Sequence, residues 1–372
     1  MTYPIRVLFL FTHMNRGGAE SMVMNYYRHI DRTKLQFDFM VHRQERGAYD
    51  DEIESLGGKI YRMMPFYPLT FPQYKKQISE FFDKHSEYQI IHGHCSELGY
   101  FVYREAAKRG VPHIIAHAHN SHAQFDLKWP FRTYFKHRMR KYLTEHFTCG
   151  QESSVWLFGS KLAKKAILQR NAIETDKYLF NPDSRKRVRE EFHLPSDALV
   201  IGHVGRFERQ KNHDFLIDVF QEIAALRSDA YLLLVGGGGN LESEIKQKVK
   251  EKGLDNKVIF TGVRPDVPDL LQAMDVFLFP SFMEGLSLSM LEAQSAGLPC
   301  IASDTIPREV EMTDLITFYP LKKSPLEWAK QVLSAASKPV DRSIYPQKIK
   351  DAGYDICQNA QWLQNYYLSL LN

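Results

Sequence analysis

Residues 5–30 read IRVLFLFT HMNRGGAE SMVMNYYRHI, and this stretch decides the fold class. Residues 5–12 are almost all apolar, which predicts a buried strand. A glycine-containing loop follows, and residues 21–30 then show a helical pattern. A strand, a loop and a helix in this order are typical of an α/β domain with a parallel sheet. We therefore expect such a sheet to begin at residue 5.

Short apolar runs alternate with longer helical stretches along the chain, and the alternation restarts in the second half. In the first half, the further expected strands are residues 37–41, 90–92 and 113–118. In the second half, they are residues 199–204, 231–235, 258–261, 276–280 and 300–303. Strands that are separated by helices pair in parallel. The repeated pattern predicts two Rossmann-like domains, which suits a length of 372 residues.

A polar, charge-rich segment, residues 171–195, separates the two sets of strands and is the expected linker region. We expect a first domain over residues 1–175 and a second domain over residues 176–346. Residues 347–372 have apolar side chains at helical spacing, and we expect this helix to pack back on the first domain.

The composition excludes several classes of protein. Hydrophobic residues make up 44% and charged residues 25%, which argues against a disordered, collagenous or repeat-dominated chain. The longest apolar run near the start, residues 7–11, is too short to span a membrane, so we expect a cytoplasmic protein. The four cysteines lie far apart, which argues against a zinc site or a disulfide framework.

A glycine and two cations lie between an expected strand and the next helix in the second domain. Gly205 would let the backbone approach a ligand, while Arg206 and Lys211 supply positive charge beside the helix start, where Asn212 is the expected N-cap. This arrangement suits a diphosphate. Two solvated loop cations explain the motif equally well when it is taken alone.

Two glutamates stand eight positions apart in residues 280–293, which read PSFMEGLSLSMLEA. With a helix that starts near Leu286, Glu284 lies in the preceding turn and Glu292 inside the helix, and eight helical residues span roughly 12 Å. That length is comparable to the reach from a sugar to a ribose across a diphosphate, and carboxylates accept hydrogen bonds from hydroxyl groups. The alternative is a pair of surface glutamates. The backbone amides expected to face the phosphates are those of Gly285, Leu286 and Ser287.

These residues together resemble the nucleotide-sugar site of glycosyltransferase family 4, whose GT-B fold consists of two facing Rossmann-like domains. The resemblance includes the Gly-Gly-Ala-Glu loop at residues 17–20, the glycine turn at residues 236–239 and the Ala-Gly-Leu-Pro segment at residues 296–299. Residues 117–121 and 305–309 most resemble the branch that builds capsular polysaccharides and exopolysaccharides.

The resemblance implies roles for these residues. Arg206 and Lys211 would bind the diphosphate, Glu292 the ribose and Glu284 the hydroxyl groups of the donor sugar. From the other domain, Gly17 and Gly18 would close over the phosphates, and a histidine would contact the sugar. His119 is the favoured histidine because it lies nearer the strand exit, while a structural role is as reasonable for His117. Val263 and Arg264 resemble the turn beside the base.

The implied activity is a retaining, hexosyltransferase-type transfer. The sugar moves from a nucleotide diphosphate sugar, with UDP favoured as the nucleotide, to a glycan or lipid-linked glycan acceptor in cell-surface polysaccharide biosynthesis. The departing diphosphate accepts the proton, so cations and amides stabilise charge and no protein nucleophile is needed. No two aspartates have Asp-x-Asp spacing, so we expect neither a metal nor a cofactor.

Three other functions compete with this interpretation. A nucleotide-sugar epimerase would use a similar scaffold, but its acid and base carboxylates are not evident. A non-catalytic regulatory partner is disfavoured because both cations and both glutamates are present. A nicotinamide dehydrogenase would require a GxGxxG motif after the first strand, and residues 13–20 lack it.

Positive charge concentrates in residues 128–143, where six Lys and Arg occur without an acid, against a net charge of +4 for the chain. A helix from Pro130 would have an apolar stripe beside a basic row, and such a helix binds anionic headgroups. We expect peripheral attachment to the inner face of the plasma membrane, with packing of the stripe on the first domain as the alternative. No nucleic-acid partner is expected. The stripe is Phe131, Phe135, Met139 and Tyr142 or Leu143, and the row is Arg132, Lys136 and Arg140.

Overall fold

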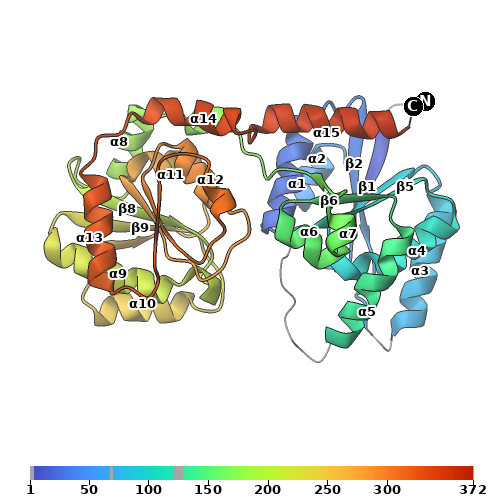
Figure 1. Cartoon of the computed structure of the whole chain (residues 1–372), viewed down its shortest axis with the longest axis horizontal. Coiled ribbons are helices and arrows are strands. Elements are labelled where there is room, and N and C mark those ends of the chain that lie inside the picture. The colour runs from blue at the N-terminus through green and yellow to red at the C-terminus, as the bar shows by residue number, and fades with distance from the viewer. Residues whose placement is uncertain (1–3, 68–69, 120–128, 372) are drawn as a thin grey trace. The chain divides into compact units, whose positions relative to one another are not determined.

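The computed structural model describes residues 4–67, 70–119 and 129–371. The chain divides into two compact units, a first unit of Met1–Ala172 with Ile356–Asn372 and a second unit of Ile173–Asp355 (Figure 1). Each unit has one parallel sheet with helices packed against it, which confirms the predicted α/β fold class. Among the described residues, no helix combines the length and the apolar character that crossing a membrane requires.

The sheet of the first unit has seven strands in the order β3-β2-β1-β4-β5-β6-β7. β1 lies at its centre, because Val7 is paired with Phe37 on one side and with Ile90 on the other. Both faces of β1 are covered, which explains its nearly continuous apolar sequence. The strands are β1 Ile5–Phe11, β2 Leu35–Val41, β3 Ile60–Arg62, β4 Ile90–Gly93, β5 His113–Ala118, β6 Glu145–Thr148 and β7 Ile167–Leu168.

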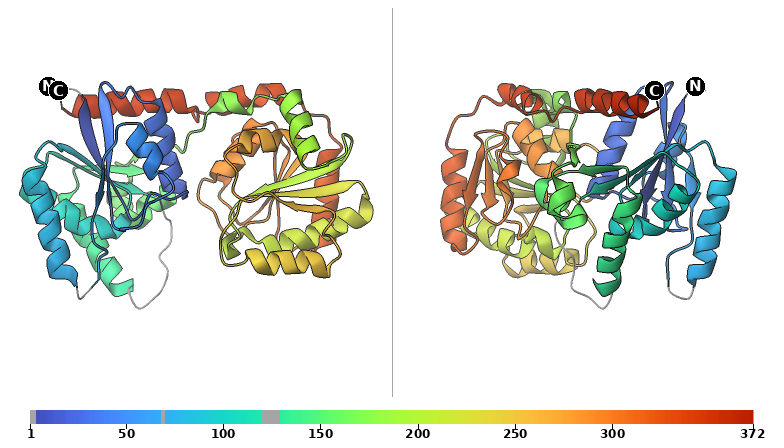
Figure 2. Two further views of the ribbon diagram at one scale, coloured as in Figure 1. Left: turned by 180° about the vertical axis from the view of Figure 1, so that it is seen from behind. Right: turned by 45° about the vertical axis from the view of Figure 1, so that its right-hand side comes forward.

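Helices cover both faces of this sheet. They are α1 Gly18–His29, α2 Asp50–Ser55, α3 Phe71–Lys84, α4 Tyr100–Lys108, α5 Trp129–Met139, α6 Gln151–Phe158, α7 Ser160–Ala163 and α15 Ile356–Leu370. The C-terminal helix α15 packs beside α1, and Leu363 and Tyr367 share a core with Phe9 (Figures 1 and 2). Residues 356–370 therefore belong to the first unit.

The sheet of the second unit has six strands in the order β10-β9-β8-β11-β12-β13. The strands are β8 Leu199–Val204, β9 Ala230–Val235, β10 Val258–Phe260, β11 Val276–Phe279, β12 Cys300–Ser303 and β13 Ile316–Tyr319. The helices are α8 Pro182–Glu191, α9 His213–Leu226, α10 Glu242–Glu251, α11 Val267–Ala273, α12 Leu288–Ser295, α13 Pro325–Ala336 and α14 Tyr345–Asp351. All five strands predicted for this half occur, and β13 is additional.

Two segments differ from the sequence-based expectations. The expected linker contains α8, which begins because the side chain of Asn181 accepts hydrogen bonds from the backbone N–H groups of Asp183 and Ser184. The expected helix over residues 347–372 is two helices, since Gly353 has a φ of +85° and separates α14 in the second unit from α15 in the first.

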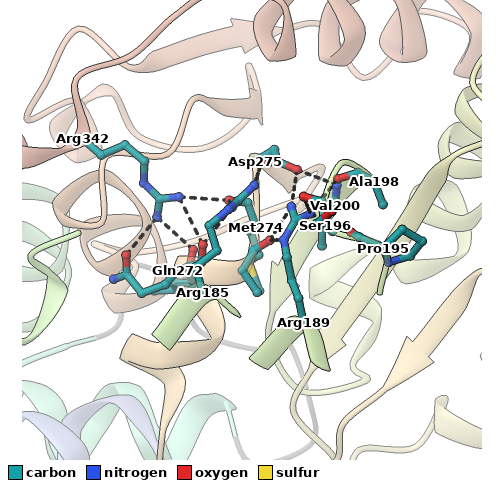
Figure 3. Close-up of polar contacts among 12 residues, drawn as sticks. Arg185, Arg189, Pro195, Ser196, Ala198, Val200, Gln272, Met274, Asp275 and Arg342 are labelled. Carbon is teal, nitrogen blue, oxygen red and sulfur yellow. Dashed lines mark hydrogen bonds and ion pairs between the residues drawn. The ribbon is translucent and has the colours of Figure 1, made fainter. Parts of the chain in front are cut away.

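A cluster of three arginines joins α8 and the segment before α14 to the end of α11 (Figure 3). Arg189 Nη2 donates to Asp275 Oδ2 at 2.9 Å and Arg185 Nη2 donates to Asp275 Oδ1 at 2.6 Å. Arg342 donates to the carbonyl oxygen of Leu271 at 3.0 Å. Carbonyl groups at a helix C-terminus have partial negative charge, so the guanidinium groups stabilise this end of α11.

In both sheets, the first strand of the unit has its sequence neighbour on one side and a later strand on the other. β1 lies between β2 and β4, and β8 lies between β9 and β11. The loops that leave such a strand and its later neighbour turn to opposite faces, and a crevice forms at the carboxyl ends of the strands. Most of the predicted site residues are on the loops at these two edges, whereas His117 lies in β5 and Glu292 on α12.

Candidate functional site

The carboxyl edge of the second sheet brings together two residues with different predicted roles. Lys211, on the loop after β8, has its Nζ 2.8 Å from Oε1 of Glu284, on the loop after β11. Their side chains are only 17% and 8% exposed. The ion pair therefore joins the two loops at the switch point, where the cation predicted for the diphosphate touches the carboxylate predicted for the sugar.

Hydrogen bonds to backbone carbonyl groups also hold these two loops together. Asn212 has a left-handed φ of +55°, and its side-chain Nδ2 donates to the carbonyl oxygen of Pro280 at 3.0 Å. The backbone N–H of Phe282 donates to the carbonyl oxygen of Gln210 at 2.9 Å. Asn212 occupies the N-cap position of α9 as predicted, but its side chain makes no capping bond because it points to the β11 loop instead.

Glycines allow the loops after β8 and β9 to pass close to each other. A Cβ atom on Gly205 would lie 3.0 Å from His203 Nε2 and 3.3 Å from Cδ of Lys211. Gly236 has a φ of +132°, and a Cβ atom there would collide with the carbonyl oxygen of Gly205. The glycine turn at residues 236–239 is thus part of the same loop cluster, and Gly205 leaves room for the stem of Lys211.

Arg206 differs from Lys211 in being exposed. Within the described part of the chain its guanidinium group has no hydrogen bond or ion pair. This side chain can reach a ligand without breaking an existing contact.

Glu292 lies on α12, which begins at Leu288 rather than at the predicted Leu286. Burial raises the pKa of the Glu292 carboxyl group, and a hydrogen bond from Tyr178 lowers it. Tyr178 lies in the expected linker, and no pattern in the sequence pointed to it. The tyrosine therefore orients the carboxylate that is predicted to bind the ribose.

The segment from Gly285 to Ser287 leads directly into α12. Ser287 is the N-cap, and its hydroxyl group is 3.0 Å from that of Ser289 instead of the backbone. Among the described residues, no side chain accepts a hydrogen bond from the backbone N–H groups at the start of α12. Backbone N–H groups at such an end attract anions.

In the turn predicted to lie beside the nucleotide base, one side chain is exposed and the other is hydrogen-bonded to carboxylates. Val263 is 59% exposed. Arg264 donates from Nε to Asp266 at 2.8 Å and from Nη1 to Glu191 at 2.6 Å. Two carboxylates therefore hold Arg264, which leaves Val263 as the apolar surface of this turn.

In the first unit, four histidines form a row at the ends of β4 and β5: His92, His94, His117 and His119. His117 is fully buried and neither of its ring nitrogens has a partner among the described residues, whereas His119 lies at the strand exit and is partly exposed. His119 Nε2 is 2.7 Å from His94 Nδ1. Burial lowers the pKa of His119 to about 4, so its ring is neutral near pH 7.

The row does not have the geometry of a metal site. Ring nitrogens of His92, His94 and His117 lie within 4.8 Å of one another. However, the three rings lie within 35° of parallel. Lone pairs lie in the ring plane, so those of stacked rings run side by side instead of converging on one ion.

Gly17 and Gly18 lie after β1, next to the β4 edge that carries His94. Gly17 is the N-cap of α1, and the carboxylate of Glu20 folds over it, so that a Cβ atom on Gly17 would collide with that group. A Cβ atom on Gly18 would meet no atom within 4 Å. Gly18 therefore presents open backbone at the start of α1.

Residues 128–143, the predicted basic segment, follow the predicted pattern only in part. Lys128 lies outside the described residues. The apolar stripe mostly packs on the first unit, where Met139 is buried and Phe135 and Tyr142 join the core. The basic row also turns inward, because Arg140 donates to the carbonyl oxygen of Leu157 and Lys136 lies over the Trp156 ring. The structure therefore shows the alternative, in which the stripe packs on the first unit, and attachment to a membrane stays a prediction. The exposed face of the segment instead includes Phe131, Tyr134, Arg138 and Lys141.

Comparisons with known proteins agree with this architecture. The family model described as Glycosyltransferase Family 4 matches residues 16–176, and the model described as Glycosyl transferases group 1 matches residues 198–337. The putative glycosyltransferase EpsF of Bacillus subtilis is 33% identical over 373 residues, which cover 97% of this chain and 96% of EpsF. The capsular polysaccharide biosynthesis glycosyltransferase CapH of Staphylococcus aureus is 24% identical, covering 98% of this chain and 99% of CapH.

A solved structure shares the fold of the whole chain. The HepE protein of Anabaena, crystallised with UDP-glucose, has a TM-score of 0.78 at 19% identity, and the match covers 98% of this chain and 99% of HepE.

Proposed function

Because the chain belongs to glycosyltransferase family 4, we propose that it transfers a sugar, with retention of configuration, from a nucleotide diphosphate sugar to a glycan acceptor. The proposed donor is a UDP-sugar, and the proposed process is the biosynthesis of a cell-surface polysaccharide. Support comes from the names of EpsF and CapH and from the UDP-glucose bound to HepE.

The observation that carries the proposal is the Lys211–Glu284 ion pair of 2.8 Å at the switch point of the second sheet. A cation for phosphate and a carboxylate for sugar hydroxyl groups lie side by side, next to the uncapped start of α12. A nucleotide diphosphate sugar offers both kinds of group, in adjacent positions. Neither partner is suited to an uncharged, apolar ligand.

In the proposed reaction, the protein stabilises the negative charge that develops on the departing diphosphate. Arg206, Lys211 and the amides of residues 285–287 are proposed to supply the fixed positive potential for this charge. Glu284 accepts hydrogen bonds from sugar hydroxyl groups, and Glu292, which Tyr178 orients, accepts them from the ribose. The diphosphate takes the proton of the acceptor hydroxyl group, so no side chain acts as a nucleophile.

The proposed acceptor is lipid-linked, and the exposed face of residues 129–142, which comprise α5 and the turn after it, is the proposed contact with the inner face of the plasma membrane. Phe131 and Tyr134 are 66% and 55% exposed, and the cations Arg138 and Lys141 lie on the same short segment. Aromatic side chains beside cations suit an anionic lipid surface.

The test is a screen of nucleotide sugars, first by thermal shift and then for transfer or slow hydrolysis, with and without EDTA. We expect a UDP-sugar to stabilise the protein and to be consumed equally in EDTA, and NMR of the product to show a retained anomeric configuration. Inversion, or a strict requirement for a divalent metal, would contradict the mechanism. Formation of an epimer from the donor alone would favour the isomerase instead.

A further inference from the structure

A hydrogen bond links the predicted sugar-contacting histidine to a second histidine that the sequence did not single out. His94 Nδ1 and His119 Nε2 are 2.7 Å apart. The two residues follow neighbouring strands, since β4 and β5 pair in parallel with Gly93 opposite Ala116. The bond therefore joins the exits of two strands at the carboxyl edge of the first sheet.

Both rings are held in place by stacking. The His94 ring stacks on Phe11 at 4.7 Å with an interplanar angle of 9°, and the His119 ring stacks on His117 at 4.2 Å with an angle of 16°. The backbone of His119 is also anchored, because the Ser153 hydroxyl group donates to its carbonyl oxygen at 3.2 Å. Neither ring can turn without losing these contacts.

Both rings are neutral near pH 7. Burial lowers the pKa of His119 to about 4 and that of His94 well below its ordinary value. A neutral imidazole carries one N–H group and one lone pair, so only one of the two rings donates in the bond between them.

The surroundings of His94 decide which ring donates. His94 Nε2 is buried and has no partner in the described part of the chain. If His119 donated, the proton of His94 would have to sit on this Nε2, and a buried N–H group without an acceptor is rare and costly. If His94 donates from Nδ1, its Nε2 keeps only a lone pair. The second arrangement is therefore the more stable one, and it leaves the proton of His119 on Nδ1.

We infer that His94 is a positioning residue that holds His119 in the tautomer protonated at Nδ1. Within the described residues, the ring of His119 hydrogen-bonds only through Nε2, so Nδ1 then offers a hydrogen-bond donor. Its ligand group must be an acceptor, such as a hydroxyl or phosphate oxygen. That ligand is the nucleotide sugar only if the proposed function holds, whereas the tautomer itself is a property of the protein alone.

Selective ¹⁵N labelling of histidine followed by long-range ¹H–¹⁵N correlation spectra at pH 7 tests the tautomer without any substrate. We expect the His94 and His119 signals, assigned with His94→Asn and His119→Gln, to show the pattern of neutral rings protonated at Nδ1. A His119 ring protonated at Nε2 would overturn the inference. This result does not depend on whether the protein is a transferase.

Kinetics of variants provide a second test. His94→Asn retains an N–H donor near the position of Nδ1, whereas His94→Leu removes it. We expect His94→Leu to lower kcat by about tenfold with little change in KM for the donor, and His94→Asn to recover most of that loss. The matched control is His92→Phe, which keeps a stacked ring and loses only the hydrogen bond between His92 Nδ1 and the Tyr367 hydroxyl group. Equal kcat values for the Leu and Asn variants, or a loss as large in His92→Phe, would contradict a positioning role.

Discussion

Lys211 and Glu284 form an ion pair that is almost withdrawn from solvent, and Lys211 Nζ also lies 4.8 Å from the centre of the Phe279 ring. For either side chain to bind a ligand, the pair has to open. Breaking a pair in such surroundings is costly unless new partners replace both halves. A diphosphate joined to a sugar supplies both partners at once, which favours the intact donor over its separate parts.

Replacement of Glu284 by Gln is expected to separate catalysis from nucleotide binding. The amide no longer holds Lys211, so the affinity for UDP should not fall. The loss of a carboxylate from the sugar should lower kcat by at least about tenfold. Titration calorimetry with UDP and initial rates with the donor measure the two effects. Glu292→Gln is the comparison, and we expect it chiefly to raise KM for the donor; the opposite outcome for the two variants would exchange their roles.

Arg206→Ala should weaken the binding of UDP by about 1.5–3 kcal/mol if the guanidinium group makes a charge-assisted bond to phosphate. Arg209 is the matched control because it is a neighbouring exposed cation on the same loop. We expect Arg209→Ala to leave the UDP affinity within assay error. Equal losses in the two variants would indicate a general effect of charge instead of a contact from Arg206.

At the scale of secondary structure elements, α5 and the residues that follow it, 140–142, show that a periodic pattern defines a face but not what that face contacts. Its apolar stripe and its basic row both exist in the sequence, yet Met139 is buried and Arg140 is bound to a backbone carbonyl group. The outward face carries Arg138 and Lys141 instead.

Co-sedimentation with vesicles tests this face of α5. Wild-type protein should pellet with anionic vesicles and not with neutral vesicles at low salt. The double variant Arg138→Gln, Lys141→Gln should bind more weakly by about 2 kcal/mol, at about 1 kcal/mol for each cation near the surface. The control is Lys136→Gln, whose ammonium group lies 4.5 Å from the centre of the Trp156 ring. Unchanged pelleting of the double variant would refute attachment through this face.

The arginine cluster provides a test of how α8 is held on the second unit. Arg189 is 4% exposed, and besides Asp275 it binds the carbonyl oxygens of Pro195, Ser196, Ala198 and Ala273. Arg189→Met should lower the free energy of unfolding by about 3 kcal/mol, because a carboxylate and buried carbonyl groups lose their donor. Hydrogen exchange of α11 measures the loss. Arg187→Met on the same helix removes only a pair with side chains 53% and 38% exposed, and it should cost less than about 1 kcal/mol.

At the scale of the whole molecule, both units bury neutral histidines. Burial lowers the pKa of His92 to about 3 and those of His119 and His213 to about 4, and it holds the pKa of His117 and His203 well below the ordinary value. Between about pH 6.5 and 4 the unfolded chain therefore binds more protons than the folded chain. Stability is expected to be fully present above about pH 6.5 and to fall as the pH drops towards 4.

His117→Phe should make this loss of stability with falling pH less steep. Each buried histidine contributes at most about 1.4 kcal/mol per pH unit to the slope, and phenylalanine preserves the stacked ring while removing the titrating group. Urea unfolding at pH 7, 6 and 5 measures the slope for both proteins. Parallel slopes would show that His117 is not held neutral.

The sequence by itself determined the class of fold and the family. The periodicity of apolar residues along a short stretch reflects which of its side chains are buried. The central strands of both sheets could therefore be predicted from the local sequence. Four short strands, β3, β6, β7 and β13, were not predicted, because runs of two to four residues show no clear period. The break between α14 and α15 was not predicted either. The sequence did not show that Gly353 adopts a φ of +85°, the conformation that ends α14.

Only the tertiary structure decided which side chains meet. Lys211 pairs with Glu284 on the neighbouring loop, and His94 bonds to His119. Arg264 is bound by the carboxylates of Asp266 and Glu191. The candidate residues were identified from motifs. A motif gives the type and position of a residue, but not where its side chain points in the folded protein. Contacts between distant loops depend on strand order and register, and hydrogen bonds depend on atoms placed to within tenths of an ångström. A one-dimensional pattern holds neither kind of information, because both arise only when each sheet assembles.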